Sequence, residues 1–126
     1  MKVKINSVRK TVSHLHVTFS TAIGTGAATW KDGIPAAGEK WEVELEIKDE
    51  FVYGENAKDA NESYSLSMKK DVINLNAQLI SITEDGTAII DINGTKVMID
   101  LIGCPSNPPR FIYLSFKGLN LYPVHL

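Results

Sequence analysis

The sequence predicts an all-β, mainly antiparallel protein, and three observations support that class. Residues 41–47 alternate apolar and charged side chains with a period of two, which is typical of a half-buried strand. Residues 72–101 hold three β-rich runs separated by turn signals. Helical periodicity is weak throughout, so we expect at most one short helix. The fold class is therefore a distorted OB-like barrel or a small β-sandwich of seven or so strands.

The first third of the chain predicts strands followed by a loop. Val3 to Phe19 indicates one long strand or two consecutive strands, because apolar residues alternate with polar ones toward its end. Ser20 to Lys40 is rich in Gly, Ala and Thr, which favours a loop. Trp41 to Ile47 is the clearest strand, with glutamates on its polar face. Residues 55–68 fit a short helix or an ordered loop equally well.

The second half of the chain predicts a meander and two closing strands. The meander runs through Val72–Ile82, Ala88–Ile92 and Val97–Leu101, with turns at Glu84-Asp85-Gly86 and Asn93-Gly94. Its hairpin register predicts a buried face that includes Ile90, Ile92, Val97 and Ile99. Three prolines interrupt regular structure between residues 103 and 110. Strands are expected again at Phe111–Phe116 and Leu119–Val124, with Gly118 as a bend between them.

Composition predicts one domain that spans residues 1–126. The 126 residues are 44% hydrophobic and 22% charged, enough for a core without disulfide or metal support. The single cysteine, Cys104, excludes an internal disulfide and a cysteine-built zinc site. No secretory signal and no apolar run of membrane-spanning length is visible, so we expect a cytoplasmic protein with no membrane partner.

Charge is unevenly distributed along the chain. The formal net charge is only −2, which argues against a dedicated nucleic-acid binder. However, residues 1–31 carry five cationic side chains and no carboxylate, whereas residues 39–62 carry nine carboxylates and three lysines. The acidic segment also contains aromatic residues, which are enriched in protein-binding hot spots. An alternative interpretation is an ordinary solvent face, in which its glutamates pair across strands with Lys2 and Lys4.

The candidates for catalysis or metal binding are weak. His14 and His16 could chelate a metal with a third ligand such as His125, but no supporting carboxylate or cysteine is suitably spaced. Residues 24–28, Gly-Thr-Gly-Ala-Ala, resemble a phosphate loop without its third glycine or its helix. Cys104 is more typical of a small buried hydrophobe than of a nucleophile.

One pair of carboxylates is a further candidate. Asp91 and Asp100 lie on neighbouring hairpin strands and would suit a hydrolase if they met in a cleft. No framework of Ser, His and Asp accompanies them. We therefore predict no enzyme, no cofactor and no metal.

Three segments resemble a group of small bacterial β-barrel immunity proteins of toxin systems, including contact-dependent growth inhibition. They are residues 38–47 (GEKWEVELEI), 82–88 (ITEDGTA) and 119–123 (LNLYP). The resemblance implies a cytosolic inhibitor that covers the active site of a cognate toxin. It implies no catalytic residues.

The leading prediction is a protein-binding module, specifically an immunity protein that neutralises a toxin with a basic active site, such as a nuclease. The predicted partner-binding residues are Glu42, Glu44, Glu46, Asp49, Glu50, Phe51, Tyr53, Glu55, Asp59 and Glu62, with Phe51 and Tyr53 as anchors. The alternative is an OB-like single-strand nucleic-acid binder, in which bases stack on aromatic side chains. Its candidate residues are Lys2, Lys4, Arg9, Lys10 and Trp30, with Phe111 and Tyr113 as further aromatic surfaces.

Overall fold

The computed structural model describes residues 1–103 and 107–124, and strand accounts for 66% of the structure. The all-β prediction is confirmed, and within those ranges no residue is helical. The strands are more numerous than the seven or so expected, and β5 and β6 are only three residues long. They are β1 Lys2–Lys10, β2 Leu15–Thr21, β3 Gly24–Trp30, β4 Lys40–Ile47, β5 Glu50–Val52, β6 Ala57–Asp59, β7 Ser65–Lys69, β8 Val72–Ile82, β9 Thr87–Ile92, β10 Thr95–Ile102, β11 Arg110–Phe116 and β12 Leu119–Pro123.

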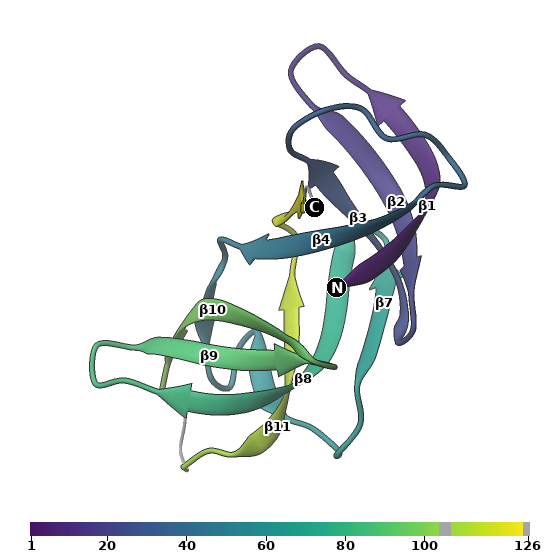
Figure 1. The fold of residues 1–126 in the computed structure, drawn as a ribbon. Helices are drawn as coiled ribbons and strands as arrows, with labels where there is room; N and C mark the ends of the chain where they lie inside the picture. The colour runs from purple at the N-terminus through teal and green to yellow at the C-terminus, as the bar shows by residue number, and fades with distance from the viewer. Residues whose placement is uncertain (104–106, 125–126) are drawn as a thin grey trace.

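Five of these strands close into a barrel, in the order β12-β4-β1-β2-β3 (Figure 1). Closure comes from a parallel pairing of β12 with β3, where Asn120 lies opposite Thr29 and Leu121 opposite Trp30. Numbered along the chain, the barrel strands follow the order one, two, three, five, four, as in an OB-like Greek key. The expected barrel is therefore present, without a helix between its third and fourth strands.

The remaining strands lie between β4 and β12 in the sequence and continue the same hydrogen-bonded sheet beyond β3, through the pairing of Gly24 with Leu66; we call this outer part the second sheet. It runs β7-β8-β9-β10-β5, and β11 pairs with the other edge of β8 and with β6. The predicted meander is β8, β9 and β10, and its two-residue turn has positive φ at Asn93 (51°) and Gly94 (104°). In Figure 1 these strands lie below the barrel, and β4 leads from the barrel into the second sheet.

One cluster of buried apolar side chains runs through the barrel and the second sheet. The four residues predicted for the buried face of the meander, Ile90, Ile92, Val97 and Ile99, are each at most 5% exposed. The alternation predicted for β4 also holds, because Val43 is 1% exposed and Glu44 is exposed. The period-two alternation in the sequence therefore predicts correctly which side chains of these strands are buried.

Two expectations about irregular segments are wrong. The predicted loop at residues 20–40 contains β3, whose small residues allow a close approach of two backbones. A Cβ on Gly24 would lie 1.8 Å from the carbonyl oxygen of Leu66, its register partner on β7. Residues 55–68 are neither helix nor one loop, because β6 and the start of β7 lie there. The Asn56 side chain holds the preceding turn, accepting from Val52 N and donating to Glu50 O, both at 2.8 Å.

Candidate functional site

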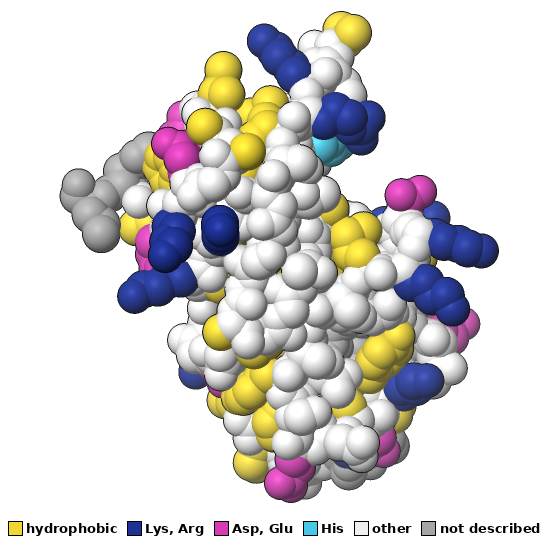
Figure 2. All heavy atoms as spheres, turned by 90° about the vertical axis from the view of Figure 1, so that its right-hand side faces the viewer, with side chains coloured by type: hydrophobic (Ala, Val, Ile, Leu, Met, Phe, Trp, Pro, Cys, Tyr) yellow, Lys and Arg dark blue, Asp and Glu magenta, His cyan; other side chains and the backbone are white. Residues whose placement is uncertain are grey.

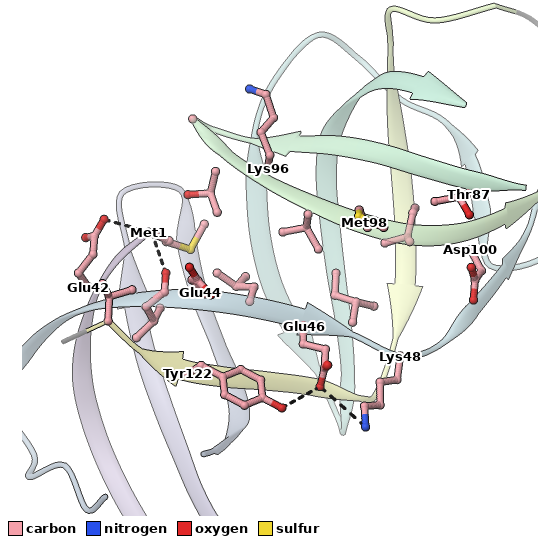
Figure 3. Close-up of a pocket in the computed structure, with 18 residues that line it drawn as sticks. Met1, Glu42, Glu44, Glu46, Lys48, Thr87, Lys96, Met98, Asp100 and Tyr122 are labelled. Carbon is pink, nitrogen blue, oxygen red and sulfur yellow. Dashed lines mark hydrogen bonds and ion pairs between the residues drawn. The ribbon is translucent and has the colours of Figure 1, made fainter. Parts of the chain in front are cut away.

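A cleft of about 1210 Å³ separates β4 of the barrel from β10 of the second sheet (Figure 3). Residues 42–48 form one wall and residues 94–100 form the other. Met1, Thr87, Tyr122 and Val124 complete the lining. The glutamates that the sequence places on the polar face of residues 41–47 therefore line an open groove somewhat larger than a typical small-molecule pocket.

The three glutamates of β4 differ in the hydrogen bonds and ion pairs that their carboxylates form within the protein. Glu42 Oε1 lies 3.4 Å from the Met1 amino group. Glu46 Oε1 accepts hydrogen bonds from Asn120 at 2.9 Å and Tyr122 at 3.1 Å, and Lys48 Nζ is 3.8 Å away. Glu44 is exposed and has no ion pair within the described ranges. Glu44 is thus the carboxylate of β4 most available to a partner.

The contacts of Glu46 shift two pKa values. The hydrogen bond from Asn120 is the main reason that the pKa of Glu46 lies below its ordinary value, and Tyr122 and Lys48 act in the same direction against partial desolvation. The same carboxylate raises the pKa of Tyr122, because the phenol donates to it. Glu46 therefore stays ionised at neutral pH and holds Tyr122 at the edge of the cleft.

The β10 wall adds an apolar anchor and another carboxylate. Met98 is 65% exposed, and Ile89, its register partner on β9, is 37% exposed. Asp100 is exposed and lies beside Glu50 in the parallel pairing of β10 with β5. Among the described residues neither Asp100 nor Glu50 forms an ion pair. An exposed thioether beside carboxylates is suited to a partner with both apolar and basic groups.

Asp91 serves the architecture and does not form the predicted pair with Asp100. Asp91 lies opposite Lys96 and is 7% exposed, whereas Asp100 lies opposite Thr87 at the other end of the hairpin. The carboxylate accepts hydrogen bonds from Tyr64 at 2.6 Å, Lys96 at 2.9 Å and Gly94 N at 3.1 Å. The two-aspartate hydrolase arrangement is therefore wrong.

These contacts set the ionisation of Asp91. Burial alone would raise its pKa, but the hydrogen bonds from Tyr64 and Lys96 and the charge of Lys96 outweigh burial, so the pKa is lowered. The hydrogen bond that Tyr64 donates to Asp91 in turn raises the pKa of Tyr64.

The acidic segment after β4 does not form one continuous face. Asp49 is half-buried and accepts hydrogen bonds from the backbone N of Lys117 at 3.3 Å and of Gly118 at 3.1 Å. Phe51 is 0% exposed and packs edge-on against Phe116, so its predicted role as a partner anchor is wrong. A three-residue strand is too short for its alternation to reveal which side chain is buried.

The other predicted acidic residues lie away from the cleft. Asp59 pairs with Arg110 on β11, and a hydrogen bond from Tyr53, more than the nearby guanidinium, lowers its pKa. Tyr53 is half-buried beside Arg110, whose guanidinium carbon is 5.9 Å from its ring. Glu55 and Glu62 are exposed in the turns around β6 and are not part of the cleft lining.

The lysines of the first strand only partly face the glutamates. Lys2 lies opposite Glu42, but Lys4 lies opposite Lys40. These three lysines border a hollow of about 540 Å³ that also includes Trp41. Figure 2 shows Lys and Arg side chains around the face that carries β1, β2 and β7, with an uncharged middle.

The aromatic side chains proposed to stack against bases are less exposed than a single-strand nucleic-acid binder requires. Trp30 is 4% exposed and packs edge-on against Trp41 with ring centroids 5.4 Å apart. It cannot serve as a stacking surface, and that prediction is wrong. Phe111 and Tyr113 are half-buried on β11.

The candidates for metal and phosphate binding do not gain support. His14 and His16 have ring centroids 6.0 Å apart, and within the described ranges no three His, Cys, Asp or Glu side chains could hold a metal ion. Their suggested third ligand, His125, and the single thiol, Cys104, lie outside the described residues. Residues 24–28 belong to β3 and not to a phosphate loop.

Comparisons with protein-family models, curated proteins and solved structures each found no match to this chain. In the part that the structure describes, no helix has the length and apolar character needed to cross a membrane. The geometry of the cleft is therefore the main guide to function. The residues of its β10 wall were not among the predicted partner-binding residues, and the sequence singled out Asp100 only as a hydrolase candidate. Period two predicts that Met98 points outward, but the sequence does not show that β10 faces β4.

Proposed function

We propose that this protein is a protein-binding module whose acidic cleft receives a basic, partly apolar segment of its partner. One observation carries the proposal: Glu42, Glu44 and Glu46 line a groove of about 1210 Å³ whose opposite wall exposes Met98. Glu44 and Asp100 have no ion pair among the described residues, so they can pair with a partner without breaking an internal contact.

Electrostatics and packing contribute differently to such binding. Lys48, Lys96 and the Met1 amino group also line the cleft, and the amino group and Lys48 pair with Glu42 and Glu46. Among the described residues, the carboxylates left to attract a basic segment and accelerate its association at low salt are therefore Glu44 and Asp100. Met98 and Tyr122 supply apolar area that remains effective after salt screens the charges. These two residues take the anchoring role that the sequence suggested for Phe51.

The specific form that we propose is a cytoplasmic immunity protein. The chain resembles immunity proteins of toxin systems in the segments around residues 38–47, 82–88 and 119–123. A toxin that cuts nucleic acid presents a basic active site, and an acidic cleft complements such a surface. In this role the protein binds and occludes, and it carries out no chemistry.

The test uses two charge-reversal variants. The cleft variant combines Glu44→Lys with Asp100→Lys, and the matched control combines Glu55→Lys with Glu62→Lys, which makes the same change of charge outside the cleft. Proteins captured from the source cells are compared with wild-type, cleft and control baits. We expect one partner that wild type and control retain and the cleft variant loses, with an association rate about tenfold lower for the cleft variant at low salt.

The same experiment can contradict the proposal. If the cleft and control variants retain one partner equally and associate at the same rate at all salt concentrations, the acidic cleft is not the binding site. If the partner is confirmed, its toxicity in cells should be suppressed by wild-type protein and not by the cleft variant. Equal suppression by both would remove the immunity role that depends on the cleft.

A second candidate function is binding of single-stranded nucleic acid at the hollow bordered by Lys2, Lys4 and Lys40. Like charges directly opposite each other, as in Lys4 and Lys40, are unfavourable unless an anion is present. None of the three lysines has an ion pair within the described ranges. Fluorescence titration with a short oligonucleotide at low salt tests this function, and Lys4→Glu with Lys40→Glu should abolish binding. No binding by wild type removes the candidate.

A further inference from the structure

β10 has an open edge along the cleft. It pairs with β9 from Thr95 to Asp100, but on its other side β5 pairs with it only from Asp100 to Ile102. Among the described residues no strand pairs with that side of residues 95–99. An unpaired strand edge presents backbone donors and acceptors that another extended chain can use.

The hairpin register identifies which backbone groups face the cleft. Thr95 pairs with Ile92 across a two-residue turn, so the N–H and C=O groups of Thr95, Val97 and Ile99 point toward β9. Leu101 follows the same alternation, since its N–H donates to Gly86 O at 2.8 Å. The N–H and C=O groups of Lys96 and Met98 therefore point to the open side.

The lining of the cleft agrees with this assignment. Seven consecutive residues of one strand and turn, 94–100, line it, whereas a strand that presented only one face would contribute alternate residues. Figure 3 shows β9 on one side of β10 and β4 across the cleft on the other. Ile102 continues the same edge, because its carbonyl accepts from Tyr53 N at 2.8 Å in the pairing with β5.

We propose that the partner enters the cleft as an extended strand that pairs with the Lys96–Met98 edge of β10. This inference rests on the proposed function and specifies how the basic segment is held. Backbone hydrogen bonds fix the segment, and its alternate side chains lie along the walls. Because Glu44 and Asp100 line those walls without internal ion pairs, Lys or Arg at alternate positions of the segment is the complementary sequence.

The first test removes backbone donors from a probe without changing its charge. The probe is a fluorescein-labelled heptapeptide of alternating Lys and Val, and its matched forms carry N-methyl groups at the odd or at the even positions. Strand pairing predicts that one methylated form binds about thirtyfold more weakly than the parent, because two hydrogen bonds of about 1 kcal/mol each are lost. Equal affinity of all three peptides overturns the strand inference and leaves the acidic cleft intact as a site.

The charge variant separates the two proposals. Glu44→Lys with Asp100→Lys should weaken the parent peptide and both methylated peptides by the same factor, because charge acts on all of them. If no peptide binds wild-type protein, or if this variant binds them unchanged, the proposed function itself fails together with the inference that rests on it.

A second test acts on the protein. Met98→Pro removes one of the N–H groups that face the cleft and breaks no hydrogen bond to β9, whereas Met98→Ala keeps that donor and, like Met98→Pro, removes the thioether. We expect Met98→Pro to bind the peptide about fivefold more weakly than Met98→Ala, because one hydrogen bond is lost. Equal binding by the two variants overturns the inference. If Met98→Pro lowers the unfolding temperature markedly more than Met98→Ala does, weaker binding could reflect a damaged fold. The comparison of N-methylated peptides on wild-type protein then decides whether the partner pairs as a strand.

A second copy of this chain is a different occupant of the same edge. Sedimentation of the wild-type protein and of Met98→Pro alone tests it. A single monomeric species for both is expected. A dimer that only wild type forms would assign the edge to self-association and overturn the inference.

Discussion

At the scale of single residues, Asp91 shows how one carboxylate joins three segments. It accepts hydrogen bonds from Tyr64 in the loop before β7, from Gly94 in the hairpin turn and from Lys96 on β10. Its pKa is lowered from 3.8 in the folded protein. A lowered pKa of a carboxyl group stabilises the fold at pH values above the unfolded-state pKa, and that stabilisation is lost as the pH falls through the folded-state pKa.

Replacement of Asp91 should therefore cause a pH-dependent loss of stability. We expect Asp91→Asn to lower the free energy of unfolding by about 2 kcal/mol at pH 7, because hydrogen bonds to a largely buried charge are lost. The difference from wild type should shrink as the pH is lowered below about 4. Urea denaturation across this pH range measures both effects. Asp100→Asn is the exposed control, and an equal loss in the two variants would contradict the structural role of Asp91.

Substitution of Phe51 tests whether this side chain lies in the core or on the surface. Its side chain is 0% exposed, so Phe51→Ala should lower the free energy of unfolding by about 3–5 kcal/mol. Met98→Ala, at a site that is 65% exposed, should change it by less than about 0.5 kcal/mol. Chemical denaturation compares the two. A fully stable Phe51→Ala protein would contradict the placement of Phe51 in the core.

At the scale of elements, the junction of β3 with β7 joins the barrel to the second sheet. Gly24 pairs with Leu66 there, and Leu66 N donates to Ile23 O at 2.9 Å. The φ of Gly24 is +142°, and a Cβ would lie 1.8 Å from the Leu66 carbonyl oxygen. The backbone approach at this junction therefore requires glycine.

Gly24→Ala should separate the two strands at this junction. We expect a loss of more than about 3 kcal/mol in the free energy of unfolding, because backbone strain and a backbone clash add. Gly33→Ala is the matched control: its φ is +81° but nothing lies within 4 Å of the added Cβ, so it should cost about 1 kcal/mol. Thermal unfolding of both variants measures the difference, and similar losses would contradict the close approach of β3 and β7.

Sequence patterns predict some of these elements better than others. Period two and two-residue turn signals are local, so β4 and the meander of β8, β9 and β10 are predicted correctly. The strand β3 is missed because Gly and Ala have low β-propensity, and their reason for being there is a contact with distant Leu66. The cleft is only half predicted. The outward position of Glu44 follows from the alternation in β4, whereas the position of Met98 on the other wall of the cleft depends on long-range packing.

At the scale of the whole molecule, folding partly preserves the separation of charge that the sequence shows. The small net charge of −2 combines a face with many lysines and a cleft whose lining holds four carboxylates beside Lys48, Lys96 and the Met1 amino group. The two regions meet where Lys2 lies opposite Glu42, which lines both hollows. The carboxylates of the acidic segment lie in different places. Some line the cleft, Asp49 contacts the turn that precedes β12, and Asp59 pairs with Arg110.

Chemical-shift mapping is the most direct test of the central claim that the cleft between β4 and β10 is the binding site. The Lys-Val heptapeptide is titrated into uniformly ¹⁵N-labelled protein at low salt, and amide shifts are followed. The account predicts the largest shifts at Glu44, Lys96, Met98 and Asp100, with none of that size at Glu55 or Glu62. Shifts centred on Lys2, Lys4 and Lys40, or spread evenly over all exposed carboxylates, would contradict it.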